Sequence, residues 1–176
     1  MKKLLLVVLF CATSLLLVPL FSASQEAGAE PVSTIAGTAT SPGPLSTGEL
    51  IYVPVYSRIY YEDSRSTLDL ATTLAIHNIN SDRTITLTKV DYYNTAGKLV
   101  RKYLEKPVVL NPMEATTMLV EKSDNTGGLA ANFVVEWQAK GEVNSPIVEA
   151  VMINASHNLG VSLTSVGKVV RPLTSR

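Results

Sequence analysis

The feature that most limits the fold of this chain is an alternation of apolar and polar side chains. In residues 68–77 the even-numbered positions hold Leu, Leu, Thr, Leu and Ile, and the odd-numbered positions hold Asp, Ala, Thr, Ala and His. Because successive side chains of a strand point to opposite faces, this pattern predicts a half-buried β-strand. No segment after residue 50 shows a convincing helical stripe of period 3.6.

Further strands of similar length are separated by turn residues. Asn80 to Arg83 and Asn94 to Gly97 are predicted turns, and residues 123–131 form a long loop of small residues. Pro54 cannot donate to a strand ladder, so its strand is predicted to lie at a sheet edge. These features predict one domain over residues 49–172, an all-β antiparallel β-sandwich of immunoglobulin-like type, with a small β-barrel as the alternative. The other predicted strands are 51–56, 84–93, 98–104, 115–121, 132–139, 147–154 and 161–170, with a short extended piece at 107–112.

The N-terminus has the composition of an export signal. Lys2 and Lys3 precede an apolar run at residues 4–21, and small residues follow at 22–24. This order predicts a signal peptide over residues 1–24, with cleavage after Ser24 or after Ala29. The protein is therefore expected in the periplasm or outside the cell. An uncleaved, membrane-anchored leader is the alternative, although the apolar run is short and contains Pro19.

Residues 25–48 are rich in Ser, Thr, Gly, Ala and Pro, which predicts a flexible tether, and residues 173–176 form a short tail. Without the leader, 13 basic residues stand against 15 acidic ones, a net charge near −2. This balance argues against nucleic acid and against polybasic attachment to anionic lipid. Cys11 is the only cysteine and lies in the leader, so the processed chain would have no disulfide or thiol chemistry.

Two carboxylates are predicted to meet if residues 132–139 and 147–154 pair as a hairpin. Burying Phe133, Val135 and Trp137 against the apolar face of the second strand would set Glu136 and Glu149 on one outward face. Like charges across a strand pair repel unless something offsets them. One interpretation is a site that holds a cation or shares a proton. The other is that Lys168 or Arg101 lies between the two carboxylates, or that solvent screens them.

The remaining chemistry-bearing residues predict no catalytic, metal or cofactor site. His77 and His157 are the only histidines, and neither belongs to a spaced cluster of ligands. No serine stands in a Gly-x-Ser-x-Gly sequence, and Gly127-Gly128 is not followed by the lysine of a phosphate-binding loop.

Tyrosines supply the candidate contact residues. Tyrosine gives a large contact area at low entropy cost, so exposed examples favour recognition surfaces. The alternative is that these side chains are half-buried strand residues. The candidates are Tyr56, Tyr60 and Tyr61 near the start of the domain, with Tyr52 beside them, and Tyr92 and Tyr93 on a neighbouring hairpin.

Several short strings occur together in the domain: Tyr52-Val-Pro-Val-Tyr-Ser57, Val90-Asp-Tyr-Tyr93, Gly97-Lys-Leu-Val100, Gly127-Gly128 with Ala131-Asn-Phe133, Val135-Glu-Trp137, and Pro146-Ile-Val-Glu-Ala-Val-Met152. In combination they resemble the bacterial domain-of-unknown-function family numbered 3124, over roughly residues 50–170. The resemblance implies an exported bacterial protein with no established activity. It supplies no catalytic residues.

Three functional hypotheses follow. The first is a non-enzymatic exported module that binds an envelope protein or a small ligand through its tyrosine-rich edge and its loops. The second is a carboxylate-based or metal-assisted enzyme centred on Glu136 and Glu149. The third is a structural spacer in the envelope whose tether sets its reach. The sequence does not decide the oligomeric state.

Overall fold

The structure is a computed structural model that describes residues 45–155 and 160–173. The predicted signal peptide, both cleavage sites, residues 25–44 of the predicted tether and residues 174–176 of the tail lie outside the described residues. The first strand begins at Ser46, so residues 46–48 belong to the domain and not to the tether.

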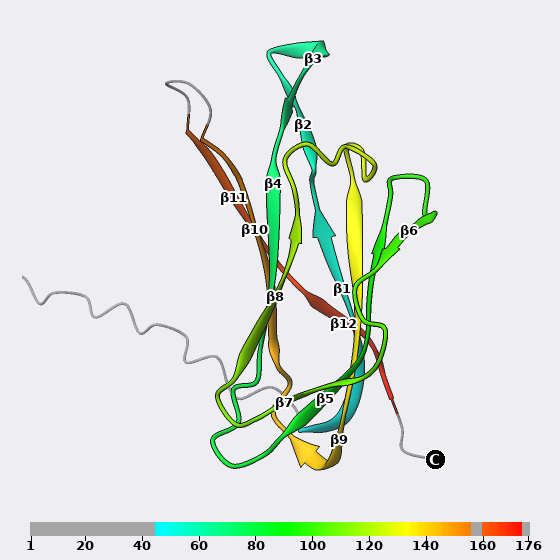
Figure 1. Cartoon of the computed structure of the whole chain (residues 1–176), viewed down its shortest axis with the longest axis vertical. Helices are drawn as coiled ribbons and strands as arrows, with labels where there is room; N and C mark the ends of the chain where they lie inside the picture. The colour runs from blue at the N-terminus through cyan, green and yellow to red at the C-terminus, as the bar shows by residue number, and fades with distance from the viewer. Residues whose placement is uncertain (1–44, 156–159, 174–176) are drawn as a thin grey trace, which may run out of the picture. The chain divides into compact units, whose positions relative to one another are not determined.

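The described chain is built from antiparallel strands, and the predicted all-β sandwich is confirmed (Figure 1). The strands are β1 (Ser46–Val55), β2 (Arg58–Tyr61), β3 (Asp63–Asp69), β4 (Ala71–His77), β5 (Ile85–Tyr93), β6 (Leu99–Lys102), β7 (Val108–Leu110), β8 (Ala115–Val120), β9 (Ala131–Val143), β10 (Ile147–Asn154), β11 (Val161–Val166) and β12 (Lys168–Pro172).

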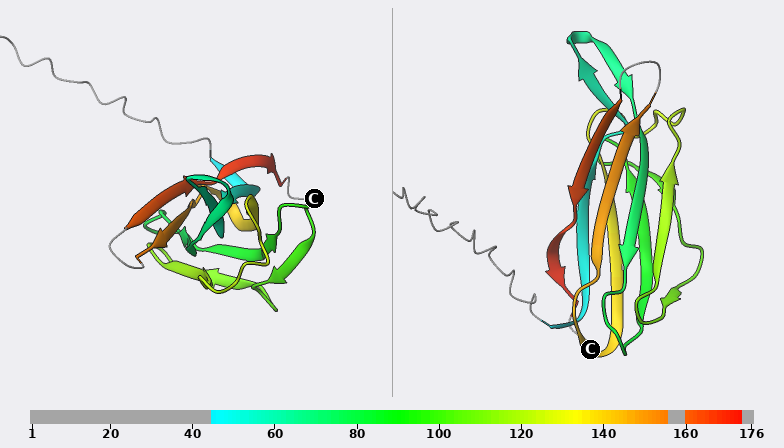
Figure 2. Two further views of the ribbon diagram at one scale, coloured as in Figure 1. Left: turned by 90° about the horizontal axis from the view of Figure 1, so that it is seen from above. Right: turned by 90° about the vertical axis from the view of Figure 1, so that its left-hand side faces the viewer.

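Two sheets form the layers of the sandwich (Figure 2). The large sheet has the order β12-β1-β9-β5-β6, with β7 also pairing β5, and the small sheet has the order β11-β10-β4-β8. Strands β2 and β3 pair only with each other and project beyond the layers at the upper end of Figure 1. We call this hairpin the arm.

The core lies between the two sheets and follows the alternation of the strands. Phe133, Val135 and Trp137 of β9 are fully buried, and Leu74 and Ile76 face them from the small sheet. The indole Nε1 of Trp137 donates a hydrogen bond to the Glu49 carboxylate at 3.2 Å, and both residues are buried. This contact satisfies a polar group that would otherwise destabilise the core.

The predicted hairpin between residues 132–139 and 147–154 is wrong. Strand β9 pairs β1 and β5 in the large sheet, whereas β10 pairs β4 and β11 in the small sheet. The connection crosses from one layer to the other. Asn80 fixes this crossing, because its Nδ2 donates to the Asn144 carbonyl at 3.0 Å and its Oδ1 accepts from the Asn144 N–H at 3.0 Å.

Two predicted strands are each divided between sheets. The chain at 68–77 breaks at Leu70, whose N–H donates to the Ser57 carbonyl at 2.9 Å, and the earlier part belongs to the arm. The chain at 161–170 breaks at Gly167, where it leaves the small sheet for the large one. An added Cβ at Gly167 would lie 2.6 Å from Ile51 Cγ2, so only glycine fits this crossing.

Strand β1 is not the edge strand that Pro54 predicts, because β12 and β9 pair it on its two sides. However, β12 pairs only Glu49 to Tyr52 of this strand. Beyond Tyr52 one side of β1 has no partner strand. Pro54, which has no N–H to donate, is tolerated there as proline is on an edge strand.

Candidate interaction surface

Four tyrosines on β1, on β2 and between them are exposed. The relative solvent exposure of these residues, Tyr52, Tyr56, Tyr60 and Tyr61, lies between 38% and 58%. The last two belong to the arm, and Tyr56 precedes its first strand. We call these four residues the tyrosine surface. Tyr56, Tyr60 and Tyr61 follow one another closely along the chain, and Tyr52 lies on the outer face of the large sheet.

The base of the arm is fastened to the sandwich. Arg58 Nε contacts Asp69 Oδ1 at 2.6 Å across the two strands of the arm, and Asn154 Nδ2 donates to the Asp69 carbonyl at 2.6 Å. Ile59 and Leu68 pack against the core from the same hairpin. These contacts fix the direction in which the arm projects while its tyrosines stay in solvent.

The tip of the arm is a tight turn. Glu62 has φ of 64°, a left-handed backbone that is uncommon outside glycine. The Asp63 carboxylate accepts hydrogen bonds from the N–H groups of Arg65 and Ser66 at 2.8 and 3.0 Å. Hydrogen bonds from Arg65 lower the pKa of Asp63, and the one from its backbone N–H has the largest effect. The carboxylate therefore holds the turn closed at neutral pH.

Tyr92 and Tyr93 separate onto opposite faces of β5. Tyr92 is fully buried and packs on Phe133, with ring centroids 5.0 Å apart, so its predicted place on a contact surface is wrong. Burial raises the pKa of Tyr92, and the neighbouring Ser57 hydroxyl offsets only part of this. Tyr93 is half-buried on the outer face, with its hydroxyl 3.5 Å from Asp91 Oδ2.

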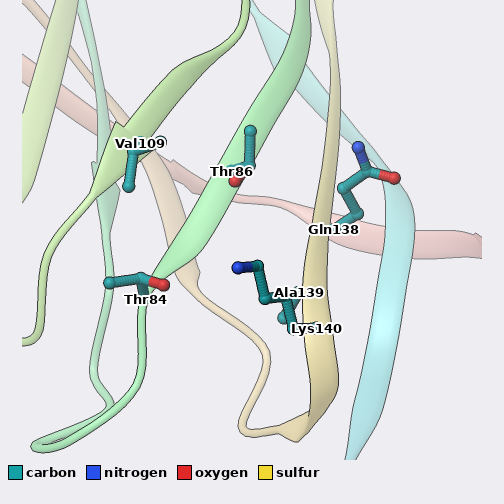
Figure 3. Close-up of a pocket in the computed structure, with 6 residues that line it drawn as sticks. All are labelled: Thr84, Thr86, Val109, Gln138, Ala139 and Lys140. Atoms are coloured by element: carbon teal, nitrogen blue, oxygen red, sulfur yellow. The ribbon is translucent and has the colours of Figure 1, made fainter.

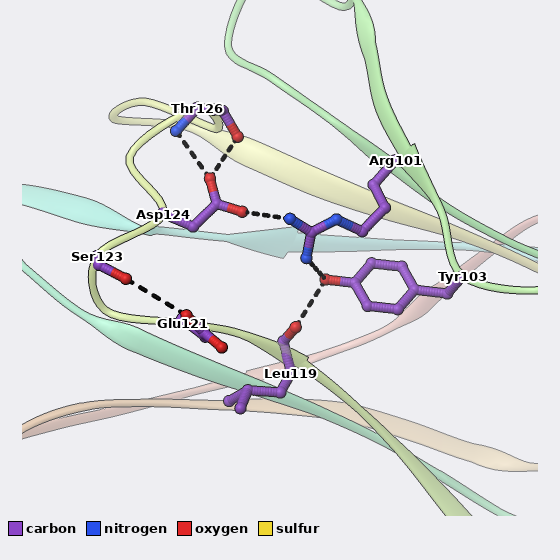
Figure 4. Close-up of polar contacts among 7 residues, drawn as sticks. All are labelled: Arg101, Tyr103, Leu119, Glu121, Ser123, Asp124 and Thr126. Carbon is purple, nitrogen blue, oxygen red and sulfur yellow. Dashed lines mark hydrogen bonds and ion pairs between the residues drawn. The ribbon is translucent and has the colours of Figure 1, made fainter.

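A clamp that sequence reasoning missed closes one side of the sandwich near the tyrosine end (Figure 4). Arg101 Nη2 contacts Asp124 Oδ2 at 2.8 Å, and Arg101 Nη1 donates to the Tyr103 hydroxyl at 3.2 Å. That hydroxyl donates to the Leu119 carbonyl of β8 at 2.8 Å. The clamp thus joins β6 of the large sheet to the edge of the small sheet. No sequence motif marks it, because Asp124 and Leu119 are distant along the chain from Arg101 and Tyr103.

Electrostatics within the clamp favour the charged carboxylate. Burial works against ionisation of Asp124, but hydrogen bonds from Thr126 and the Arg101 charge outweigh it and lower the pKa of Asp124. The hydrogen bond to Tyr103 raises the pKa of Arg101, and burial raises the pKa of Tyr103. Arg101 is therefore engaged here and does not lie between Glu136 and Glu149.

Glu136 and Glu149 do not meet. Both point away from the core, but they belong to different sheets and so lie on opposite outer faces. Lys89 Nζ lies 3.6 Å from Glu136 Oε2, and Thr88 Oγ1 donates to Glu136 Oε1 at 3.0 Å. The predicted meeting of the two carboxylates is wrong. The alternation correctly predicted which face of each strand points outward, but the two strands do not pair with each other.

A shallow pocket lies on the outer face of the large sheet, at the end opposite the arm (Figure 3). Its volume is about 460 Å³, and its only charged lining residue is Lys140. It offers hydroxyl groups and one cation to a small polar molecule, but none of the predicted site residues. The lining residues are Thr84, Thr86, Val109, Gln138, Ala139 and Lys140.

Two negative findings concern residues 45–155 and 160–173. Nowhere in these ranges do three or more His, Cys, Asp or Glu side chains gather in a group that could hold a metal ion. These ranges also contain no helix of the length and apolar character needed to cross a membrane.

Comparison with known proteins gives a family and a distant structural likeness. The crystal structure of Thermotoga maritima 1070 is similar with a TM-score of 0.43 at 12% sequence identity, and the match covers 71% of this chain and 97% of that chain. No curated protein matches the sequence. The family described as "Protein of unknown function (DUF3124)" matches residues 48–170, which is nearly the whole described domain. The chain therefore belongs to the DUF3124 family.

Proposed function

We propose that this protein is an exported, non-enzymatic interaction module that binds a protein of the bacterial envelope through its tyrosine surface. The leader-like N-terminus supports export. The observation that carries the proposal is the exposure of Tyr60 and Tyr61 on the projecting hairpin, with exposed Tyr56 just before it and exposed Tyr52 on the outer face of the large sheet. Exposed aromatic side chains in solution contribute nothing to the core, and they are enriched where one protein contacts another.

The placement of the ends of the domain supports the same proposal. Strand β1 enters the sandwich at Ser46 and runs the length of the large sheet before the arm begins (Figure 1). Ten extended residues span roughly 33 Å. The Leu173 N–H donates to the Gly48 carbonyl at 2.7 Å, so the C-terminal end lies beside the same entry point. A domain held through its N-terminal segment would present the tyrosine surface away from the attachment.

The geometry favours a protein partner over a small ligand at this end. A small ligand is usually bound in a concave pocket with convergent polar groups. Two pockets among the described residues lie at the other end of the domain, around Thr84 and Lys140. A projecting hairpin with exposed aromatics offers instead a convex surface, which fits a groove or a sheet edge of another protein.

Affinity capture from the envelope fraction of the native host tests the proposal. The wild-type chain is expected to recover a defined partner, and the Tyr60→Ser/Tyr61→Ser variant to lose it. A matched control, Ile79→Ser/Val109→Ser, removes two exposed apolar side chains away from the tyrosine surface and should retain the partner. Equal recovery by both double variants would contradict the proposal.

A further inference from the structure

The shallow pocket on the outer face of the large sheet lies where strand β9 bulges. In the ladder with β1, the single residue Thr47 stands opposite residues 139–142 of β9. The ladder of β9 with β5 ends just before these residues, at Gln138. Bulges occur often beside active sites, where they change the direction of a side chain. The side chain that this bulge carries into the pocket is that of Lys140.

The pocket combines one cation with neutral polar groups. Figure 3 shows Lys140 extending from β9 toward β5, whose end carries two threonines that line the pocket. Thr84 and Thr86 offer hydroxyl groups, Gln138 offers a carboxamide, and Val109 adds an apolar wall. None of the described residues that line the pocket is acidic. Its volume of about 460 Å³ is in the range of small-molecule sites.

The charge of Lys140 has no counter-charge among the described residues. No carboxylate there comes within ion-pair distance of its ammonium group. Glu136, further along β9, is held by Lys89 with Nζ and Oε2 3.6 Å apart. Asp82 lines only the smaller pocket next to this one, and Glu142 lines neither. The ammonium group is therefore available to an anion from solution.

We propose that this pocket binds a small hydroxylated carboxylic acid of the sugar-acid class. The carboxylate accepts a charge-assisted hydrogen bond from Lys140 Nζ. The hydroxyl groups of the ligand exchange hydrogen bonds with Thr84, Thr86 and the Gln138 carboxamide, each of which can donate and accept. The C–H groups of the ligand pack on Val109. One cation among neutral polar groups matches a single negative charge better than a phosphate dianion or a cationic ligand.

The inference goes beyond the proposed function, because the pocket and the tyrosine surface share no residue and lie at different ends of the domain. A protein partner at the arm and a sugar acid at the pocket can therefore be tested separately. The Tyr60→Ser/Tyr61→Ser variant should bind the sugar acid as the wild type does. Its failure to do so would link the two sites and contradict the assignment to this pocket.

An NMR titration of the isotope-labelled chain, purified as its cells produce it, tests the ligand class. D-Glucuronate should shift the amide signals of residues 84–86 and 138–140, with a Kd on the order of 1 mM, since an open pocket makes few contacts. D-Glucose lacks the carboxylate and should bind at least about tenfold more weakly, the loss expected for one charge-assisted hydrogen bond. Acetate lacks the hydroxyl groups and should also bind more weakly. This comparison needs no variant. Equal binding of glucuronate and glucose, or of glucuronate and acetate, would overturn the proposal.

Two variants test the residues. Lys140→Met removes the charge while keeping a long side chain, and should weaken glucuronate binding about tenfold. The matched control is Lys98→Met, the same change at another exposed lysine, which should bind as the wild type does.

The double variant Thr84→Val/Thr86→Val removes both hydroxyl groups and should weaken the binding of glucuronate without changing that of acetate. Glucuronate that shifts no signal of the pocket would overturn the inference. Binding to Lys140→Met that is as tight as to the wild type would do the same.

Discussion

The hydroxyl of Tyr92 lies directly against Gly127, so close that a Cβ at Gly127 would come 1.8 Å from the hydroxyl oxygen. Among the described residues this buried hydroxyl has no partner within hydrogen-bonding geometry. The neighbouring Ser57 Oγ donates to the Gly128 carbonyl at 3.0 Å. The loop of residues 121–130 thus closes over a tyrosine whose ring is tightly packed but whose hydroxyl lacks a hydrogen-bond partner among the described residues. This relationship connects the core to the loops at the tyrosine end.

Gly127→Ala should lower the free energy of unfolding by about 1–3 kcal/mol, because the added methyl group overpacks the site. Tyr92→Phe should be nearly neutral or stabilising, since it removes an unsatisfied buried hydroxyl. The double variant should recover only part of the loss caused by Gly127→Ala, because Tyr92 Cζ and Ala131 Cβ would still lie 2.7 and 2.9 Å from the added Cβ. Chemical denaturation of the four proteins measures this coupling, and strictly additive effects would show that the two residues do not touch.

The Arg101–Asp124 clamp predicts a loss of stability in acid. The pKa of Asp124 is lowered in the folded state, so its contribution is full above the unfolded pKa of about 3.9 and is lost as the pH falls through the lower folded value. Asp124→Asn should cost about 1 kcal/mol at pH 7 and flatten the pH dependence below about pH 4. Asp82→Asn removes a partner of the exposed Arg83 at 3.5 Å and serves as the control, with little expected effect. Identical acid profiles for the wild type and Asp124→Asn would count against the clamp.

The contact between Glu49 and Trp137 can be followed by fluorescence, because Trp137 is the only tryptophan of the chain. Its complete burial predicts a blue-shifted emission in the folded state. Glu49→Ala leaves the indole N–H unpaired and should destabilise the fold by about 1–3 kcal/mol. Glu49→Gln keeps an acceptor oxygen and should be milder. Equal losses in the two variants would mean that the hydrogen bond to the indole does not matter.

Gly167 predicts a steric effect at the crossing between the sheets. Gly167→Ala should destabilise by about 1–3 kcal/mol, because its methyl group would press on Ile51 and on the Val148 carbonyl. Gly141→Ala is the matched control, since nothing lies within 4 Å of an added Cβ there. Thermal unfolding should show a lower melting temperature for the first variant only. If both variants melt as the wild type does, the crossing has space for a methyl group at position 167, which would contradict the structure.

The alternation of side chains predicted which face of each strand is buried, and β9 and β10 follow it residue by residue. It did not predict which strands pair, because many partners bury an apolar face equally well. The predicted hairpin failed for this reason, and with it the meeting of Glu136 and Glu149.

The burial of Tyr92 was hidden by a different effect. Ile85 and Leu87 point inward, but the register shifts between Leu87 and Lys89, and the phase then changes so that Val90 and Tyr92 point inward. A β-bulge of this kind leaves no reliable mark in a single sequence. Tyr60 and Tyr61 needed no such information, because they stand beside a tight turn in a short hairpin.

Site-specific photo-crosslinking in living cells tests the central claim most directly. A photoreactive amino acid at position 60 should give one defined adduct with an envelope protein, and the adduct should fade when Tyr61→Ser is added. The same amino acid at position 109, which is exposed at the opposite end of the domain, should give none. Adducts of equal yield at both positions, or none at position 60, would contradict the account.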